Sequence, residues 1–205
     1  MKLNALANSV RLAIIYTPVI ITGLITSAHA DDPCNSADSM TYICSGRGTS
    51  GIDLAGSSLN VSTAPGFGID TTEANAIKLT NSGGELILKD ENQSQIIGGD
   101  NGITAINDNS ATNMMVTSTG HVNGGSNAVY AQNSGTGATV ITTTGTINSG
   151  NVGINAVNGS HTTGLTISTD STFGVGVDAI NATNNGTGGT TVTTSGNISS
   201  GRHGI

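Results

Sequence analysis

The two cysteines of this 205-residue chain, Cys34 and Cys44, are the side chains best suited to covalent chemistry. A nucleophilic thiolate needs an adjacent base, and the next histidine along the chain is His121. In an exported protein the default state of such a pair is a disulfide, because the compartment is oxidising. We therefore expect a Cys34–Cys44 disulfide that closes a short loop, with two free thiols as the alternative.

The other polar side chains do not form a catalytic motif. No serine stands in the Gly-Asp-Ser-Gly setting typical of a serine protease, and the histidines at 121, 161 and 203 lie about 40 residues apart. Enzymes that cleave polysaccharides carry clusters of acidic and basic groups, but only four basic residues follow residue 30. The sequence thus predicts no catalytic residues and a protein that is not an enzyme.

Two Gly-x-Gly-x-Asp segments, at 66–70 and 174–178, are similar to the core of calcium-binding nonapeptide repeats. Those repeats act in tandem because each ion is shared between successive turns, and here the two copies are more than 100 residues apart. We interpret both as glycine turns before a strand. No metal ion or other cofactor is expected.

These residues belong to a repeat of about 25 residues. The segment GINAVN at 153–158 has relatives at 76–81, 102–107, 128–133 and 176–181. Each copy ends in an asparagine, namely Asn81, Asn107, Asn133, Asn158 and Asn181. Self-similarity at such a period indicates a stacked repeat architecture. We expect these asparagines to form a structural ladder between neighbouring coils rather than a binding site.

A second recurrence runs alongside the first, with aliphatic residues at 116, 141, 167 and 192, and each unit contains three short apolar stretches separated by turns. Alternation inside the stretches has the period of a half-buried strand. One unit cannot bury itself, so the units must stack. The predicted fold is an all-β, parallel β-solenoid of about seven coils in three sheets, in the form of a right-handed β-helix.

Composition agrees with a thin core. The chain has 30 glycines, no tryptophan and only 2% aromatic residues, which normally fill a thick core. Residues 1–30 have the features of a signal peptide, with cleavage between Ala30 and Asp31. Residues 31–50 are expected to cap the solenoid, and residues 51–205 to form its coils.

Removing residues 1–30 leaves four basic and 13 acidic residues, a net charge of −9. Binding of nucleic acid needs a basic surface, so nucleic acid is excluded as a partner.

The signal peptide is followed by Asp-Asp-Pro-Cys34, by Thr-Tyr-Ile-Cys44-Ser-Gly46 and then by coils rich in Gly, Asn and Thr. This order resembles the N-terminal part of the passenger domain of a Gram-negative autotransporter (type V secretion), of the pertactin-like adhesin type. The resemblance implies translocation through an outer-membrane barrel, followed by folding outside the cell as an adhesion scaffold. Its partner would be a protein or glycan ligand on a host or neighbouring cell.

No run of residues similar to the barrel strands occurs in the 205 residues, so we expect a fragment or a truncated product. The expected location is the outer membrane and cell surface if a barrel is attached, and the periplasm if the chain is complete. Two alternatives stay open. One is a polysaccharide lyase or hydrolase built on a β-helix, and the other is a two-partner or trimeric exported adhesin.

Overall fold

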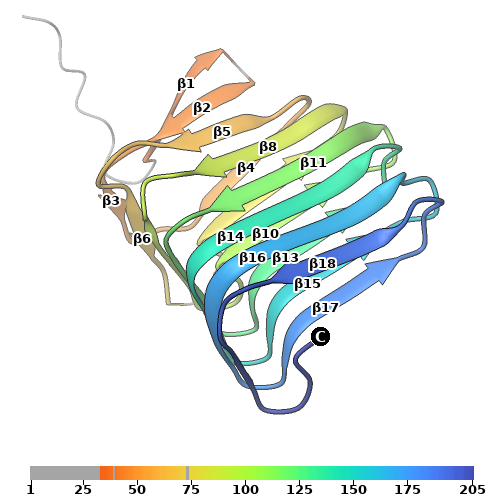
Figure 1. Cartoon of the computed structure of the whole chain (residues 1–205). Coiled ribbons are helices and arrows are strands. Elements are labelled where there is room, and N and C mark those ends of the chain that lie inside the picture. The colour runs from red at the N-terminus through yellow and green to blue at the C-terminus, as the bar shows by residue number, and fades with distance from the viewer. Residues whose placement is uncertain (1–32, 39, 73) are drawn as a thin grey trace, which may run out of the picture.

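The computed structural model of the chain describes residues 33–38, 40–72 and 74–205. The expected signal peptide and its cleavage site at Ala30 and Asp31 lie outside the described residues. The described part contains 19 strands and no helix. Figure 1 shows the strands stacked as successive rungs, from β1 at one end of the molecule to the C-terminus at the other.

One face of the solenoid is a six-stranded parallel sheet. Its strands are β4 (Ile52–Gly56), β7 (Ile77–Asn81), β10 (Ile103–Asn107), β13 (Asn127–Asn133), β15 (Val152–Asn158) and β17 (Asp178–Asn184). Paired residues of adjacent strands are 25 or 26 positions apart, as from Ile77 to Ile103 to Val129. The predicted parallel β-solenoid is therefore confirmed, with about six turns instead of about seven coils.

The other two faces belong to one 13-stranded sheet with two arms. The first arm contains β2 (Thr41–Cys44), β5 (Asn60–Thr63), β8 (Gly84–Asp90), β11 (Ala111–Ser118) and β18 (Thr190–Thr194). The second contains β3 (Arg47–Gly48), β6 (Gly68–Asp70), β9 (Gln95–Gly98), β12 (His121–Gly124) and β19 (Ile198–Ser200). Two long strands, β14 (Ala138–Ser149) and β16 (Gly164–Val175), pass through both arms. Two of the three sheets predicted from the sequence are therefore joined into one sheet by β14 and β16.

The N-terminal end departs from the parallel pattern. Strand β1 (Cys34–Asp38) pairs antiparallel with β2, and Cys34 forms a disulfide with Cys44. Cys44 is fully buried and packs in the hydrophobic core. This crosslinked hairpin lies at the end of the stack in Figure 1.

Inward side chains form columns that run from rung to rung. In the six-stranded sheet one column is aliphatic throughout, and the next changes from Leu54 and Leu79 to Ala105, Ala131 and Ala156. The first arm contributes columns such as Leu88, Val116, Ile141 and Ile167. Alternating strands place these residues inside and polar residues outside, as the period-2 pattern predicts.

A column of glycines marks one corner of the coil. A Cβ atom added to Gly125 would lie 2.0 Å from the carbonyl oxygen of Gly99, and one added to Gly176 would lie 2.0 Å from that of Gly150. Contacts this short are impossible for a real side chain, so only glycine lets successive coils approach here.

Candidate functional site

The predicted asparagines at 81, 107, 133 and 158 occupy one register position of the six-stranded sheet. All four side chains are fully buried. Asn81 donates from its amide to Oδ1 of Asn107 over 3.0 Å. No other direct amide-to-amide bond joins this column in the described residues. The expected asparagines are therefore stacked in register, but they do not form a continuous chain of hydrogen bonds.

Each of these amides donates a hydrogen bond to a backbone carbonyl in or just after the turn that follows its strand. Asn81 donates to the carbonyl of Gly84 over 3.2 Å, and Asn158 donates to that of Gly164 over 2.8 Å. Asn107 and Asn133 make similar bonds to carbonyls of Asn113 and Gly137. The asparagines therefore end the strand and satisfy the buried polar groups of the corner.

The prediction for Asn181 is wrong. Asn181 pairs in the register with Asn155, which points outward, and the side chain of Asn181 is exposed. The residue beside Asn158 is Asn184, whose amide donates to the carbonyl of Gly188 over 2.9 Å. The segment AINATN at 179–184 is the true copy of GINAVN, and its 26-residue distance from Asn158 is the signal that identifies it.

A second amide column, missed in the sequence, runs along another corner through Asn75, Asn101 and Asn127. Asn101 donates to Oδ1 of Asn75 over 2.8 Å, and Asn127 donates to Oδ1 of Asn101 over 2.8 Å. The next residue in the column is Val152, so Oδ1 of Asn127 is buried without a partner. The regular spacing of 26 residues could have revealed this column.

A buried carboxylate lies inside a third polar column. Oδ1 of Asp90 accepts hydrogen bonds from Thr63 and Ser94, and Oδ2 accepts one from Ser118 over 2.9 Å. Asp90 is fully buried. Farther along, Thr143, Thr169 and Ser171 continue the column with bonds between hydroxyl groups. The first and third columns face inward, and the second lies at a corner where Asn75 and Asn127 are partly buried and the amides bond to one another.

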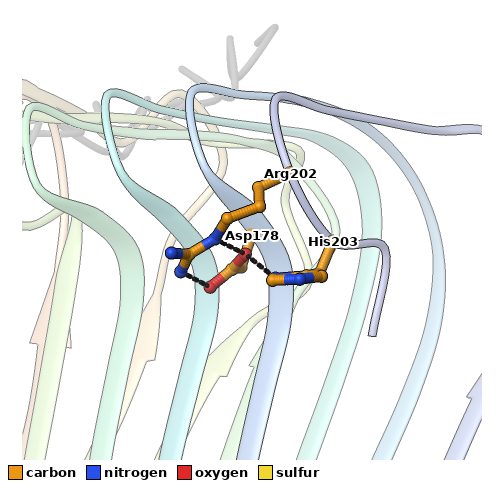
Figure 2. Close-up of polar contacts among 3 residues, drawn as sticks. All are labelled: Asp178, Arg202 and His203. Carbon is orange, nitrogen blue, oxygen red and sulfur yellow. Dashed lines mark hydrogen bonds and ion pairs between the residues drawn. The ribbon is translucent and has the colours of Figure 1, made fainter.

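One cluster of charged side chains does reach the surface. Oδ2 of Asp178 lies 2.9 Å from Nη2 of Arg202, and Oδ1 lies 2.9 Å from Nδ1 of His203 (Figure 2). Hydrogen bonding from Arg202 lowers the pKa of Asp178 to about 2, and His203 adds to this effect. The three residues are 24 and 25 positions apart and meet because that distance is close to one turn of the solenoid.

This cluster is a poor candidate for catalysis. The carboxylate that would act as a general base is held ionised, and both its oxygens are occupied. The same bonds make Asp178 a link between two coils, although it ends one of the two Gly-x-Gly-x-Asp segments. Asp70, which ends the other, is exposed on β6. Within the described ranges no group of three acidic, histidine or cysteine side chains is arranged to hold a metal ion.

The outer face of the first arm is the most regular surface of the molecule. One outward column contains Lys89, Thr117, Thr142, Ser168 and Thr193, in register across five rungs. A neighbouring column starts with Thr41 and Asn60, becomes apolar at Ile87, Met115 and Val140, and continues with Thr166 and Thr191. Beside its apolar part lies a groove of about 250 Å³ bordered by Glu85 and Asn113.

Over the part of the chain that the structure describes, no helix is both long and apolar enough to cross a membrane. Comparison of the chain with models of protein families, with curated proteins and with solved structures finds no match. The functional interpretation therefore depends on the geometry of the chain itself.

Proposed function

We propose that the chain is the passenger segment of an exported protein and acts as a non-enzymatic scaffold for adhesion. The observation that carries this proposal is the outer face of the first arm, where Thr and Ser side chains repeat from rung to rung over β14, β16 and β18. A rigid array of hydroxyl groups suits many weak, repeated contacts with a polymer or a cell surface. A solenoid supplies such an extended surface at every turn.

Export and translocation through an outer-membrane barrel are part of the same proposal. Supporting features are the signal-like residues 1–30, the cysteine pair that closes a loop at the start of the mature chain, and the stacked coils that follow. The coils have no tryptophan and few charged residues, which is compatible with passage of an unfolded chain. The ligand would be a protein or glycan on a neighbouring cell.

Binding to cells tests the adhesive role directly. Fluorescent beads coated with residues 31–205 are incubated with cultured epithelial cells and with bacteria, and bound beads are counted by flow cytometry. We expect binding that is lost in the double variant Ser168→Arg, Thr193→Arg, which places two bulky charges on the hydroxyl face. The double variant Asn181→Arg, Thr183→Arg is the matched control, because it adds the same charges to outward positions of β17.

Two outcomes would contradict the proposal. The first is the absence of bead binding to every cell type, and the second is equal loss of binding in both double variants. Retained binding in the Ser168 and Thr193 variant would show that adhesion uses another surface.

A further inference from the structure

Three successive rungs of the outer face share an apolar column, and Ile43 is exposed two rungs before Lys89 in the neighbouring column. Ile87, Met115 and Val140 are direct partners in the register of β8, β11 and β14. Val140 is 36% exposed, and the other two are half-buried. Adjacent rungs are about 4.8 Å apart, so the column presents a stripe about 10 Å long. Elsewhere in this register the outward residues are polar, and covering this short stripe would remove apolar surface from water.

Two opposite charges flank the stripe at equal distances. Glu85 and Lys89 point outward from β8, two residues before and after Ile87, with Leu86 and Leu88 buried between them. Each therefore lies about 7 Å from the apolar column, on opposite sides. Neither takes part in an ion pair among the described residues, although the Glu85 carboxylate accepts a hydrogen bond from the side-chain amide of Asn113 over 2.7 Å.

We propose that this face binds a second copy of the chain, through a two-fold axis that runs along the Ile87–Met115–Val140 column. Such an axis lies between two facing sheets, parallel to the solenoid, and places each residue of the column opposite its own counterpart. The same rotation carries Lys89 of one copy to the position facing Glu85 of the other, and the reverse. The face is therefore complementary to itself in both shape and charge.

The other in-plane axis is disfavoured. An axis parallel to the strands forms no Glu85–Lys89 pair. If it runs along β8 it places Glu85 opposite Glu85 and Lys89 opposite Lys89, which is repulsive, and if it runs along β11 it places both opposite β14, which carries no charge. Charge thus selects the first arrangement, in which the two solenoids lie side by side and point in the same direction.

The groove supplies the place for the incoming lysine. It lies between the Glu85 side of the face and the apolar column, and is lined by Leu86, Met114 and Met115 with Glu85 at its border. A lysine carries a long apolar stem and a charged end. Lys89 of the second copy would lay that stem over the methionines and bring its ammonium group to Glu85.

The interface is small, so the dimer is weak. A face of six rungs and five residues per strand buries on the order of 500 Å² per copy, or about 1,000 Å² in total, which is the range of transient complexes. Several copies fixed on one surface would still associate, because neighbours are present at high effective concentration. The dimer would cover the Ser168 and Thr193 columns, so dimerisation and the proposed adhesion would compete for one face, although dimerisation is measured without any adhesive ligand.

Charge reversal provides the decisive test. Sedimentation equilibrium of residues 31–205 at concentrations from about 10 to 500 μM should show a concentration-dependent dimer. Glu85→Lys and Lys89→Glu should each weaken dimerisation about tenfold or more, and the double variant should recover it to within about threefold. A monomer at all concentrations, or a double variant no better than the singles, would overturn the proposal.

Two further measurements guard against misfolded variants and other interfaces. Met115→Thr with Val140→Thr should abolish the dimer and keep the circular dichroism spectrum, because Thr166 and Thr191 already occupy this column. The matched control, Ile106→Thr with Val157→Thr, removes similar side chains from the outer face of the six-stranded sheet and should leave the dimer intact.

Carbodiimide crosslinking identifies the contact itself. In a mixture of isotope-labelled and unlabelled chains, mass spectrometry should find a Glu85–Lys89 amide that joins the two populations. A dimer that yields only crosslinks between other residues would also refute the proposed axis.

Discussion

Asn81 donates a hydrogen bond from its side-chain amide to Oδ1 of Asn107, 26 residues farther along the chain, over 3.0 Å. Both side chains are fully buried at the same corner of adjacent coils. The bond therefore joins two turns at a place where water cannot replace it.

Replacement of Asn107 by alanine should destabilise the solenoid. It removes the acceptor for Asn81 and the donor to the carbonyl of Asn113, which leaves buried polar groups unpaired. The expected loss in the free energy of unfolding is about 1–3 kcal/mol, measured by urea denaturation. Asn181→Ala is the matched control, since that exposed asparagine belongs to the same sequence motif and should change stability by less than about 0.5 kcal/mol. Equal losses in both variants would contradict the structural role.

Replacement of Asp90 by alanine should have a larger effect. Three buried hydroxyl groups, those of Thr63, Ser94 and Ser118, lose their common acceptor. We expect a loss of roughly 2–4 kcal/mol in the free energy of unfolding. Asp170→Ala is the control, because this exposed carboxylate accepts a bond from the Ser195 hydroxyl at the surface. If Asp90→Ala were as mild as the control, the buried column would not contribute to stability.

Asp178 should make stability depend on acid pH. Its pKa is lowered to about 2 in the folded chain, against about 3.9 in an unfolded one. The stabilisation is therefore complete above about pH 4 and is lost as the pH falls towards 2. Thermal melting between pH 5 and 2 should show a steeper decline for the wild type than for Asp178→Asn. Because Arg202 is largely exposed, 1 M salt should reduce the difference between the two proteins. Parallel curves would contradict the assignment.

Reduction of the Cys34–Cys44 disulfide should loosen one end of the molecule. The bond closes a loop of ten residues, worth about 3 kcal/mol on the chain-entropy model. Hydrogen exchange should accelerate in β1, β2 and β5 after reduction and stay unchanged in β14 and β16. Uniform acceleration along the whole chain would mean that the coils unfold as one unit instead of from the ends.

Gly145→Ala should destabilise the bend inside β14. Gly145 has a φ of +99°, and an added Cβ atom would lie 2.4 Å from the carbonyl oxygen of Gly120. The expected loss is more than about 1 kcal/mol, measured by thermal or urea unfolding. At Gly189 no atom lies within 4 Å of an added Cβ atom, so Gly189→Ala should be close to neutral.

The fold was predictable because one period governs the six-stranded sheet, although the first coils of the other sheet depart from it, with partners 19 positions apart from Thr41 to Asn60 and 28 apart from Ile87 to Met115. Residues 25 or 26 apart become neighbours in the register, so the recurring aliphatic positions in the sequence identify the inward columns directly. Continuity of two faces through β14 and β16 was not predictable, because it depends on strands that bend without interruption.

The polar interior was predictable only where residue type repeats. Asn81, Asn107, Asn133 and Asn158 share both a spacing and a side chain, whereas Asn181 and Asn184 end overlapping copies of the motif and only the spacing separates them. The column around Asp90 mixes Thr, Ser and Asp, and such a mixture leaves no recognisable pattern in a chain rich in Thr and Ser. The contact between Asp178 and Arg202 could be predicted only from the exact pairing of residues in adjacent coils, and the repeat length indicates that pairing only to within a residue or two.

The direction of the inter-rung hydrogen bonds has a mechanical consequence. In a stack of parallel rungs these bonds run along the long axis, so tension between the two ends of the chain loads them lengthwise and detaches the outermost coil first. Each detached coil of about 25 residues would release roughly 85 Å of extended chain. Under load the molecule would lengthen in steps of nearly equal size, and the coils still stacked would keep their outer faces in place.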